Sequence, residues 1–537
     1  MPPTTTAPSG TGRGADPGAT LERGLTVLRA LAADPSARLG RSALTRTTGL
    51  ARATVDRITA TLIRMGYARP DGSDVQLAPR VLELGNAYLS AERVTDAMRP
   101  VVLDLAADLD ESVSVCVPDG DGARFVLQCP RQRAMTPAFR VGDLLAVERC
   151  APGALFAAGW DRRRWRAWRS AAAPGAFEAR AATARGLGFA VDDQLTEPGL
   201  IAVSVPVPGP DGSAARTLNV VSHTSRHTAV ELTAHALPRL RRTADALRTV
   251  LAGPGGGPPA ADATGIRADV ELRSAKGELG PDFLQSLARG LAVLRALDVP
   301  GGLTLSALAE KVGLARASAR RPLLTLQRLG YVDAATDGRF VLLPRVLELG
   351  YATVPPLDYE QLVRPHLAAL ALRLNDSASS AVLDGSDIRY VARVGARRIM
   401  SVDLGVGTRL PAYATAMGRV LLGDLERDAR TLRLEQMAPR SLTPHTRTSP
   451  AAVVDAARRD GYALVDEELE EGLRSIALPV RDAGGRAVAA VNISAHAVQR
   501  SAADLRDRVL PELRSAVRHI EADLAAAAGR DPQSLPA

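Results

Sequence analysis

Arginine and hydroxyl residues recur at the same spacing in two segments of the chain, 51–57 and 315–321. A guanidinium group can bind a guanine edge or a phosphate, and a hydroxyl near a helix start can bind a phosphate or a base. A single helix often carries a solvated charged face, but the repetition of the pattern favours contact with double-stranded DNA. The residues expected to contact DNA are Arg52, Thr54, Arg57, Arg316, Ser318, Arg320 and Arg321.

A second group of residues could bind a small acid. They lie at the start of an expected helix, in a turn before an expected strand, and on the strand that follows. The first N–H groups of a helix favour an anion, and Arg474 is a candidate partner for a carboxylate. A few polar groups on an apolar face suit a ligand pocket, although each could be a satisfied strand or turn residue. The candidates are Thr415, Asp466, Arg474, Ser475, Asn492 and Ser494, with the acidic run 466–471 otherwise read as a solvated loop.

No catalytic or metal centre is expected. The seven histidines show no HExxH spacing, and the chain contains neither GxSxG nor GxxxxGK[ST]. Cys116, Cys129 and Cys150 are odd in number and widely spaced, which predicts neither a disulfide framework nor a zinc site and suits a reducing cytoplasm. We therefore expect no enzymatic activity, no metal and no cofactor.

Composition limits the class of protein. A length of 537 residues predicts three or four domains. The net charge of +8 is mild for this length, so a nucleic-acid surface must be local, and 3% aromatic residues argue against binding by base stacking. No apolar run approaches the ~18 residues of a membrane span, and the first residues lack a signal-peptide pattern. We expect a cytoplasmic protein with no membrane partner.

The elements that carry these residues occur twice. PRVLELG is found at 79–85 and again, letter for letter, at 344–350. The period is far longer than that of a solenoid, so the chain is a duplicated two-domain unit, joined by a Gly/Pro/Ala-rich linker at 252–265. Four more pairs align in the same order: LERGLTVLRAL with LARGLAVLRAL, TLIRMGY with TLQRLGY, DGDGARFV with DGSDIRYV, and GFAVDD with GYALVD.

Each copy begins with the pattern of a winged helix-turn-helix. In the second copy, leucines at three- and four-residue steps predict a helix over 284–297. A short helix with Ser306 as its expected N-cap ends at Gly313, a third helix follows, and a hairpin turns at 337–338. The first copy repeats this order, with helices at 21–32, 42–47 and 51–65 and a hairpin turn at 71–72. The third helix of such a domain enters a major groove and the hairpin meets phosphates.

Two residues depart from a DNA-reading helix. Asp56 places a carboxylate on the groove-facing surface, which is unfavourable near phosphate but can accept from a cytosine amine. Pro322 lies inside the third helix of the second copy, where it removes an N–H donor and clashes one turn back. We expect Pro322 to kink this helix or to confine its regular part to the turns after it.

The segment after each winged domain predicts an α+β fold. In the second copy, a glycine-bearing loop precedes a helix that is expected to begin near Ala414. Asn492 and Ser494, two residues apart in a strand, share a face. The other expected elements are helices at 361–374 and 502–525 and strands at 379–383, 389–394, 474–480 and 487–494.

These segments resemble the IclR family of bacterial transcription regulators over nearly the whole chain, in two tandem copies. The second copy is the closer match. The resemblance implies a winged helix-turn-helix joined by a linker helix, starting here at Pro79 and Pro344, to a GAF-like α/β effector domain. It also implies dimerisation through the DNA-binding domains and no enzymatic activity. Four segments look like the branch that regulates protocatechuate, 4-hydroxybenzoate and β-ketoadipate metabolism: FLQSLARGLAVLRAL, LTLSALAEKVGLARASARR, RIMSVDLGVGTRLPAYATAMGRVLL and GYALVDEELEEGLRSIALPVRDAGGRAVAAVNISAHA.

The resemblance also implies residues of an effector pocket. Positions matching Ala416, Met417, Ser475, Asn492 and Ser494 line that pocket in the family, and Asp466 lies one residue from the usual acidic position. The first copy keeps only Asn219 and Asp193 among the corresponding polar residues, so its sensor is expected to bind a more apolar ligand or none. The residues that replace the others are Cys150, Pro152, Ile201, Ala202 and Val221.

Together these features predict a ligand-responsive DNA-binding regulator of aromatic-acid catabolism. Because one chain carries both winged domains, we expect them to pair within the chain, while whole chains pair again through their sensors. The alternative is a small-molecule sensor or assembly protein that has lost specific DNA binding. The expected α+β architecture is a disordered leader (1–19), a winged helix-turn-helix domain (20–90), a degenerate effector domain (91–250), a linker (251–281), a second winged helix-turn-helix domain (282–354) and a second GAF-like effector domain (355–530).

Overall fold

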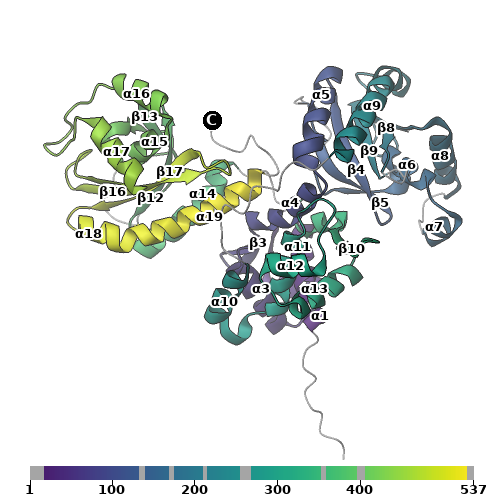
Figure 1. Ribbon diagram of the computed structural model, residues 1–537, viewed down its shortest axis with the longest axis horizontal. Coiled ribbons are helices and arrows are strands. Elements are labelled where there is room, and N and C mark those ends of the chain that lie inside the picture. The colour runs from purple at the N-terminus through teal and green to yellow at the C-terminus, as the bar shows by residue number, and fades with distance from the viewer. Residues whose placement is uncertain are drawn as a thin grey trace, which may run out of the picture. The chain divides into compact units, whose positions relative to one another are not determined.

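The computed structural model describes residues 17–34, 36–131, 139–168, 174–209, 215–253, 268–351, 358–395 and 405–528. Residues 1–16 of the expected leader, residues 254–267 of the expected linker between the copies and the residues around Val354 lie outside these ranges. The described residues up to 351 form one compact unit, and those from 358 onward form a second (Figure 1).

The first winged helix-turn-helix domain has the expected order of elements. Gly49 adopts a left-handed conformation (φ 68°), which lets the chain turn between the second and third helices. One face of each of these two helices is apolar. The second helix buries Leu44, and the third buries Val55, Ile58 and Leu62. The elements are α1 (Pro17–Ala33), β1 (Arg38–Gly40), α2 (Arg41–Thr48), α3 (Arg52–Arg64), β2 (Ala68–Asp71) and β3 (Asp74–Leu77).

The second winged domain repeats this order with a simpler wing. Its short helix begins earlier than expected: the Thr304 side chain accepts a hydrogen bond from the Ala307 N–H, so Thr304 is the N-cap. The prediction that Ser306 caps this helix is therefore wrong, because a hydroxyl two residues earlier already fills the position. The elements are α11 (Gln285–Ala296), α12 (Leu305–Val312), α13 (Arg316–Arg328), β10 (Val332–Ala334) and β11 (Phe340–Leu342).

Helix α13 continues through Pro322 on both sides, so the prediction that its regular part starts after the proline is wrong. The missing N–H would have bonded to the carbonyl of Ser318, which lies in the first turn of the helix. Pro322 is buried beside Ala319, Leu323 and Leu326 on the inner face of α13. Burial of the proline ring in the domain core offsets the lost hydrogen bond.

The two winged domains pack against each other through α1 and α11. Gly24 lies against Leu287, and Gly290 lies against Leu21, so closely that a Cβ atom at either glycine would overlap the opposing leucine. All four residues occupy equivalent positions in the repeat, which makes the contact reciprocal. The packing therefore has the form of a symmetric dimer contact made within one chain.

Ion pairs repeat the same reciprocal relation. The Arg295 guanidinium lies 3.0 Å from the Glu83 carboxylate, and the Arg29 guanidinium lies 3.7 Å from the Glu348 carboxylate. These pairs are half-exposed, so each contributes little on its own. Their value is to fix the register of the contact.

The linker helix expected in each copy forms only in the first. There α4 (Leu82–Ala91) follows a short 3-10 helix, η1 (Pro79–Val81). In the second copy a 3-10 helix, η5 (Pro344–Leu349), ends at Gly350, whose φ of 128° is not helical. Pro355 and Pro356 follow in the sequence and have no N–H to continue a helix. The prediction of an α-helix starting at Pro344 is wrong for the described residues.

Both sensor domains contain a six-stranded antiparallel sheet of the same strand order. In the first sensor the order is β6-β5-β4-β9-β8-β7, formed by β4 (Ser112–Asp119), β5 (Gly122–Cys129), β6 (Leu144–Ala146), β7 (Ala190–Asp193), β8 (Leu200–Val207) and β9 (Arg216–His223). In the second it is β14-β13-β12-β17-β16-β15, formed by β12 (Ser377–Asp384), β13 (Asp387–Val394), β14 (Arg409–Pro411), β15 (Ala463–Asp466), β16 (Leu473–Arg481) and β17 (Ala487–His496).

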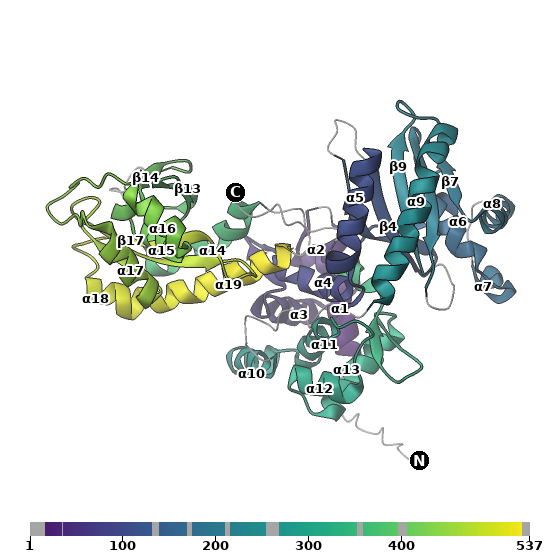
Figure 2. The same cartoon turned by 45° about the horizontal axis from the view of Figure 1, so that its top comes forward.

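Helices cover both faces of each sheet (Figures 1 and 2). In the second sensor α14 and α19 bury Ile476, Leu478 and Val491 on one face, while α15 covers Ala477 and Ala490 on the other. The first sensor has α5 and α9 on one face and α6 on the other. The helices are α5 (Arg99–Leu109), α6 (Ala151–Ala158), α7 (Arg162–Ala167), α8 (Pro174–Leu187), α9 (Ala229–Ala252), α14 (Tyr359–Leu374), α15 (Ala416–Asp424), α16 (Arg427–Glu435), α17 (Pro450–Asp460), α18 (Ala502–Asp504) and α19 (Leu510–Ala528).

Among the described helices, none is both long and apolar enough to cross a membrane.

Filling either interhelical glycine should weaken the pairing of the winged domains. Gly24→Val or Gly290→Val places a branched side chain against a buried leucine, and we expect a loss of about 1–3 kcal/mol in the free energy of unfolding of the first unit. Denaturant unfolding of the full chain measures it. Gly186→Ala, with no heavy atom within 4 Å of its new Cβ, is the matched control and should not destabilise. Equal stability of all these variants would contradict the packing.

Candidate DNA and effector sites

The third helix of the first winged domain carries its predicted DNA contacts unequally. Arg52 is exposed at the start of α3, and Thr54 is half-buried. The Arg41 guanidinium lies 3.6 Å from the Asp56 carboxylate, which partly neutralises the acidic residue on this helix. Arg57 is exposed but already engaged: its guanidinium donates to the Pro281 carbonyl at 2.7 Å and lies 3.4 Å from the Asp282 carboxylate.

These contacts belong to an acidic segment that leads into the second copy, α10 (Ala268–Leu279) and the 3-10 helix η4 (Gly280–Asp282). Arg64, on α3, donates to Ser274 at 3.0 Å and to the Glu278 carboxylate, and this hydrogen bond lowers the pKa of Glu278. The Leu284 N–H donates to Thr61 at 3.1 Å. The α10–η4 segment therefore holds one edge of the first recognition helix, an arrangement that no motif in the sequence indicates.

The second recognition helix is less encumbered. Arg316, Arg320 and Arg321 on α13 are exposed, and no described residue forms a hydrogen bond or ion pair with their guanidinium groups. Ser318 is half-buried in the first turn. Arg320 stands where the first copy has Asp56, so the two recognition helices differ in charge at equivalent positions.

In the second sensor, strand register brings three predicted effector residues onto one face. Ser475 pairs directly with Ser494, and Asn492 pairs with Ala477 and with Ser379. Directly paired residues of antiparallel strands point to the same side of a sheet. Ala477 belongs to the core beneath α15, so all of these side chains face α15.

The start of α15 lies over this face. The Thr415 side chain accepts a hydrogen bond from the Gly418 N–H at 3.1 Å and caps the helix, which begins at Ala416, two residues later than expected. Ala416 and Met417 are buried in the same core as Ala477. The first N–H groups of a helix have no intrahelical acceptor, so the helix presents donors at this end.

Arg474 and Asp466 do not join this group. They pair with each other across β15 and β16 and point to the face covered by α14 and α19, because neighbours of Ser475 in a strand point to the opposite side. Arg474 also donates to the carbonyls of Ala497 at 2.7 Å and Arg500 at 2.9 Å. The structure separates the expected carboxylate partner from Ser475 and Asn492.

Two polar atoms on the α15 side are buried without a hydrogen-bond partner in the part of the chain that the structure describes. They are the Ser379 Oγ and the Asn492 Oδ1, while the Asn492 amide donates to Ser494 at 2.9 Å. Arg393 pairs in register with Ser379 and places a cation on the same face. Ser379 and Arg393 were missed in the sequence because isolated polar residues in expected strands carry no motif.

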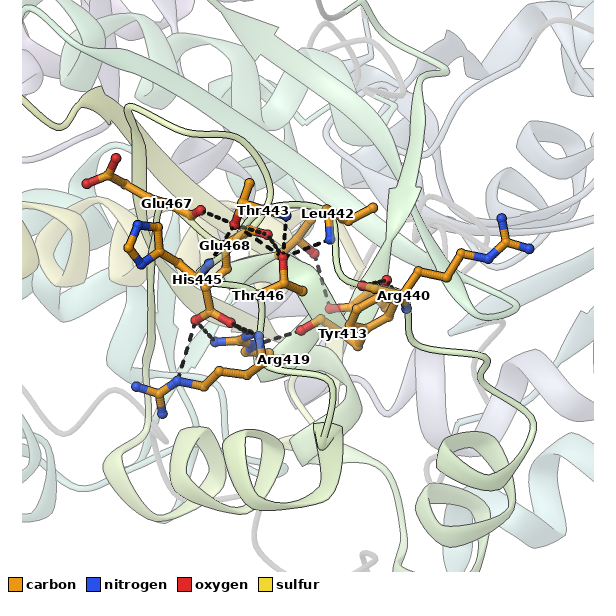
Figure 3. A network of polar contacts seen from close by, with 12 residues as sticks. Tyr413, Arg419, Arg440, Leu442, Thr443, His445, Thr446, Glu467 and Glu468 are labelled. Atoms are coloured by element: carbon orange, nitrogen blue, oxygen red, sulfur yellow. Dashed lines mark hydrogen bonds and ion pairs between the residues drawn. The ribbon is translucent and has the colours of Figure 1, made fainter.

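A buried ion pair holds α15 in place (Figure 3). The Arg419 guanidinium donates to both oxygens of Glu468, at 2.9 and 2.6 Å, and to the Tyr413 carbonyl at 2.8 Å. The Thr446 hydroxyl donates to the Glu468 carbonyl at 2.6 Å, and the Arg447 N–H donates to its carboxylate at 3.0 Å. The prediction that the whole 466–471 run is a solvated loop is wrong at Glu468, which is only 4% exposed.

The first sensor lacks this ion pair, since Ala154 and Leu195 stand at the positions of Arg419 and Glu468. Its three cysteines are free thiols and buried. Burial raises the pKa of Cys129 to about 11 and of Cys150 to about 12, so both thiols stay protonated at neutral pH and are poor nucleophiles. Among the described residues no cluster of His, Cys, Asp or Glu could hold a metal ion.

Models of two domain families each match the chain twice. The "Bacterial transcriptional regulator IclR C-terminal" model matches residues 86–249 and 352–522, and the "IclR helix-turn-helix domain" model matches residues 20–72 and 286–334. The chain belongs to the IclR family of bacterial transcriptional regulators. The order of matches confirms the tandem duplication and the resemblance found in the sequence.

Individual IclR-family relatives correspond to one copy of the repeat. The "Pca regulon regulatory protein" of Pseudomonas putida is 42% identical over 248 residues, which are 45% of this chain and 84% of that protein. The "p-hydroxybenzoate hydroxylase transcriptional activator" of Acinetobacter baylyi is 34% identical over 44% of this chain and 91% of that protein. A solved regulator from Rhodococcus has 48% identity and a TM-score of 0.41, covering 45% of this chain and 98% of that chain.

Breaking the buried ion pair should destabilise the second sensor. Glu468→Gln keeps the shape of the side chain but leaves Arg419 charged and buried, which should lower the free energy of unfolding by about 3–5 kcal/mol. Glu470→Gln, the same change at an exposed residue of the same loop, should stay within about 0.5 kcal/mol. Thermal unfolding of the full chain compares the two, and equal behaviour would refute the role of Glu468.

Proposed function

We propose that this IclR-family chain is a ligand-responsive regulator of aromatic-acid catabolism that reads DNA in the cytoplasm with two unlike winged domains of one chain. The single observation that carries the proposal is the reciprocal α1–α11 packing, which gives one chain the pair of winged domains that a dimer would supply. A covalent connection raises the effective concentration of one winged domain near the other to roughly the millimolar range.

The two winged domains are not equivalent. On α13 three exposed arginines can reach guanine edges or phosphates, whereas on α3 Arg57 is held by the α10–η4 segment and Asp56 adds a negative charge. A DNA site for this pair should therefore contain two different half-sites. We propose that whole chains also associate through their sensor domains.

The second sensor is proposed to bind a small aromatic acid or its ring-cleavage product. Support comes from the polar group facing α15, formed by Ser379, Ser475, Asn492 and Ser494, with the donors of the α15 N-terminus and the cation of Arg393 on the same side. A buried carboxylate needs charged or N–H partners. The relative named as a p-hydroxybenzoate hydroxylase transcriptional activator points to the same class of ligand.

Removing arginines from the recognition helices should weaken binding to the DNA that flanks the gene. Arg316→Ala, Arg320→Ala and Arg321→Ala should each cost about 1–3 kcal/mol if they contact a base. Arg57→Ala should cost less than Arg321→Ala at the equivalent position, since Arg57 must first leave Pro281 and Asp282. Mobility shifts measure the affinities.

Arg486→Ala, the loss of an exposed arginine in a sensor turn, is the charge-matched control for these variants. Unchanged affinity in every recognition-helix variant would refute DNA reading by these helices and favour a sensor that has lost specific DNA binding.

Binding of an aromatic acid should depend on the polar face of the second sensor. Calorimetry on the full chain with 4-hydroxybenzoate, protocatechuate and β-ketoadipate should show saturable heat for at least one acid. Ser475→Ala or Asn492→Leu should weaken it roughly tenfold, the loss of a hydrogen bond to a charged group. Asn219→Leu, the same change at the equivalent residue of the first sensor, should leave it intact. If only Asn219→Leu abolished acid binding, the acid site would lie in the first sensor, and its assignment to the second sensor would be wrong.

A further inference from the structure

The first sensor carries its own row of polar side chains on the sheet face beneath α6. Asn219 on β9 pairs directly with Ser114 on β4 and with Ser204 on β8, and Ser114 pairs with Gln128 on β5. Paired residues share a face, so these side chains form one row across four strands. Thr217 stands in the next row, on the same face as Asn219.

Four atoms of these rows are buried without a hydrogen-bond partner among the described residues: the Ser204 Oγ, the Thr217 Oγ1, the Asn219 Oδ1 and the Gln128 Nε2. Ser204 and Thr217 are fully buried and Asn219 is 2% exposed. The Asn219 amide is used, donating to the Ser114 carbonyl at 3.2 Å. Buried polar atoms in proteins are nearly always satisfied, so four on one face point to a bound molecule as their partner.

These groups are not remnants of the site in the second sensor. Ser204 and Thr217 stand where the second copy has Ala477 and Ala490, whereas Ala202 and Val221 stand at the positions of Ser475 and Ser494. The hydroxyl groups are therefore shifted by two residues along β8 and by four residues along β9. A ligand held by them would sit in a different register on the sheet.

The charges around this face differ as well. Asp192 on β7 pairs with Ala202 and so faces the same side; it accepts from the Leu195 N–H at 2.7 Å and from Thr196. Burial raises the pKa of Asp192, while hydrogen bonds from Thr196 and Leu195 and the charge of Arg180 on α8 oppose that shift. In its charged form the Asp192 carboxylate repels a carboxylate on a ligand.

The rest of the surroundings is apolar. Cys116, Phe125, Cys150 and Phe156 form one buried cluster between the sheet and α6. Cys116 also touches the Asn219 amide, which places the cluster beside the polar row. Cys150 is the N-cap residue of α6 but makes no side-chain cap bond, unlike Thr415 in the second sensor.

We propose that the first sensor binds an uncharged small molecule bearing hydroxyl or carbonyl groups, held by Ser204, Thr217 and Asn219, so that one chain responds to two ligands of different charge. A hydroxyl group of the ligand donates a hydrogen bond to the Asn219 Oδ1, and its hydroxyl or carbonyl oxygens accept hydrogen bonds from the hydroxyls of Ser204 and Thr217. The inference rests on the proposed function only in treating this domain as a sensor.

The chain contains a reporter that is confined to the first sensor. All three tryptophans of the protein, Trp160, Trp165 and Trp168, pack with Phe177 in the core formed by α6 and α8. That core includes Ala190, which pairs with Ser204 on the neighbouring strand. Tryptophan emission of the full chain therefore reports on this domain and contains no signal from the second sensor.

The test titrates the full chain with 4-hydroxybenzyl alcohol and with 4-hydroxybenzoate, which share a ring and a phenol but differ in charge. We expect the alcohol to change tryptophan emission saturably and the acid to leave it unchanged. Equilibrium dialysis counts bound alcohol directly. Absence of saturable alcohol binding in both measurements, or a saturable emission change with the acid alone, overturns the proposal.

Variants separate a ligand site from buried water. Ser204→Ala and Thr217→Val should weaken alcohol binding at least about fivefold. They should also raise the melting temperature of the ligand-free chain, because each removes an unsatisfied buried hydroxyl. Ser222→Ala on β9 is the control: its hydroxyl already donates to Glu111 at 3.0 Å, so its loss should lower the melting temperature and leave binding intact. Destabilisation by Ser204→Ala and Thr217→Val with unchanged alcohol binding assigns these hydroxyls to structural water and overturns the proposal.

The same titrations distinguish this proposal from the function assigned to the second sensor. Ser475→Ala should abolish the heat of 4-hydroxybenzoate binding without changing the tryptophan response to the alcohol. If the acid binds as expected while the alcohol does not, only the two-ligand inference fails. If the alcohol binds and no acid does, only the assignment of the second sensor fails.

Discussion

The contact between α1 and α11 depends on two glycines that let each helix approach a leucine of the other. In a homodimer the same contact would join two identical chains, and any change in one helix would appear at once in both. Here Leu21 and Gly24 are encoded separately from Leu287 and Gly290. The packing can therefore keep its symmetry while everything attached to it diverges, and the other differences between the halves follow from this freedom.

The recognition helices show how far the divergence has gone. Asp56 and Arg320 are equivalent in position and opposite in charge, and among the described residues an acidic segment lies along the first recognition helix and none along the second. In this chain that segment is also the entry into the second copy. Its ion pairs are partly exposed except at Glu271, where burial alone would raise the pKa but hydrogen bonds from Arg80 leave the pKa below its usual value. The first recognition helix is thus stabilised by contacts that also occupy its arginines.

Much of the fold could be predicted because the repeat shows the sequence pattern of each element twice. Helix and strand positions follow from hydrophobic spacing, and Gly49 and Gly313 mark the turns. The opposite facing of Arg474 and Ser475 was also available from the sequence, since adjacent strand residues point to opposite sides. The Arg419–Glu468 pair was not, because its members lie 49 residues apart and no local pattern joins them. Ser204 and Thr217 were missed because comparison of the copies finds polar residues that both copies keep, and the second copy has Ala477 and Ala490 at these positions.

For either ligand to change DNA binding, it must bind one conformation of the chain better than another, and the winged domains must differ between the two conformations. In the first unit a packed route for such coupling is visible. Helix α4 leads from the first wing into the first sensor, and the Tyr351 ring from the second winged domain lies directly against Gly85 of α4. At the far end of α4, Arg93 donates to the carbonyls of Val250 and Gly253 at the end of α9. A shift of α9 or α4 on ligand binding would thus press on both winged domains at once, since α4 contacts elements of each. A close-packed interior transmits such a displacement instead of absorbing it. The first sensor, which the sequence marked as degenerate, has a continuous packed connection to the winged domains.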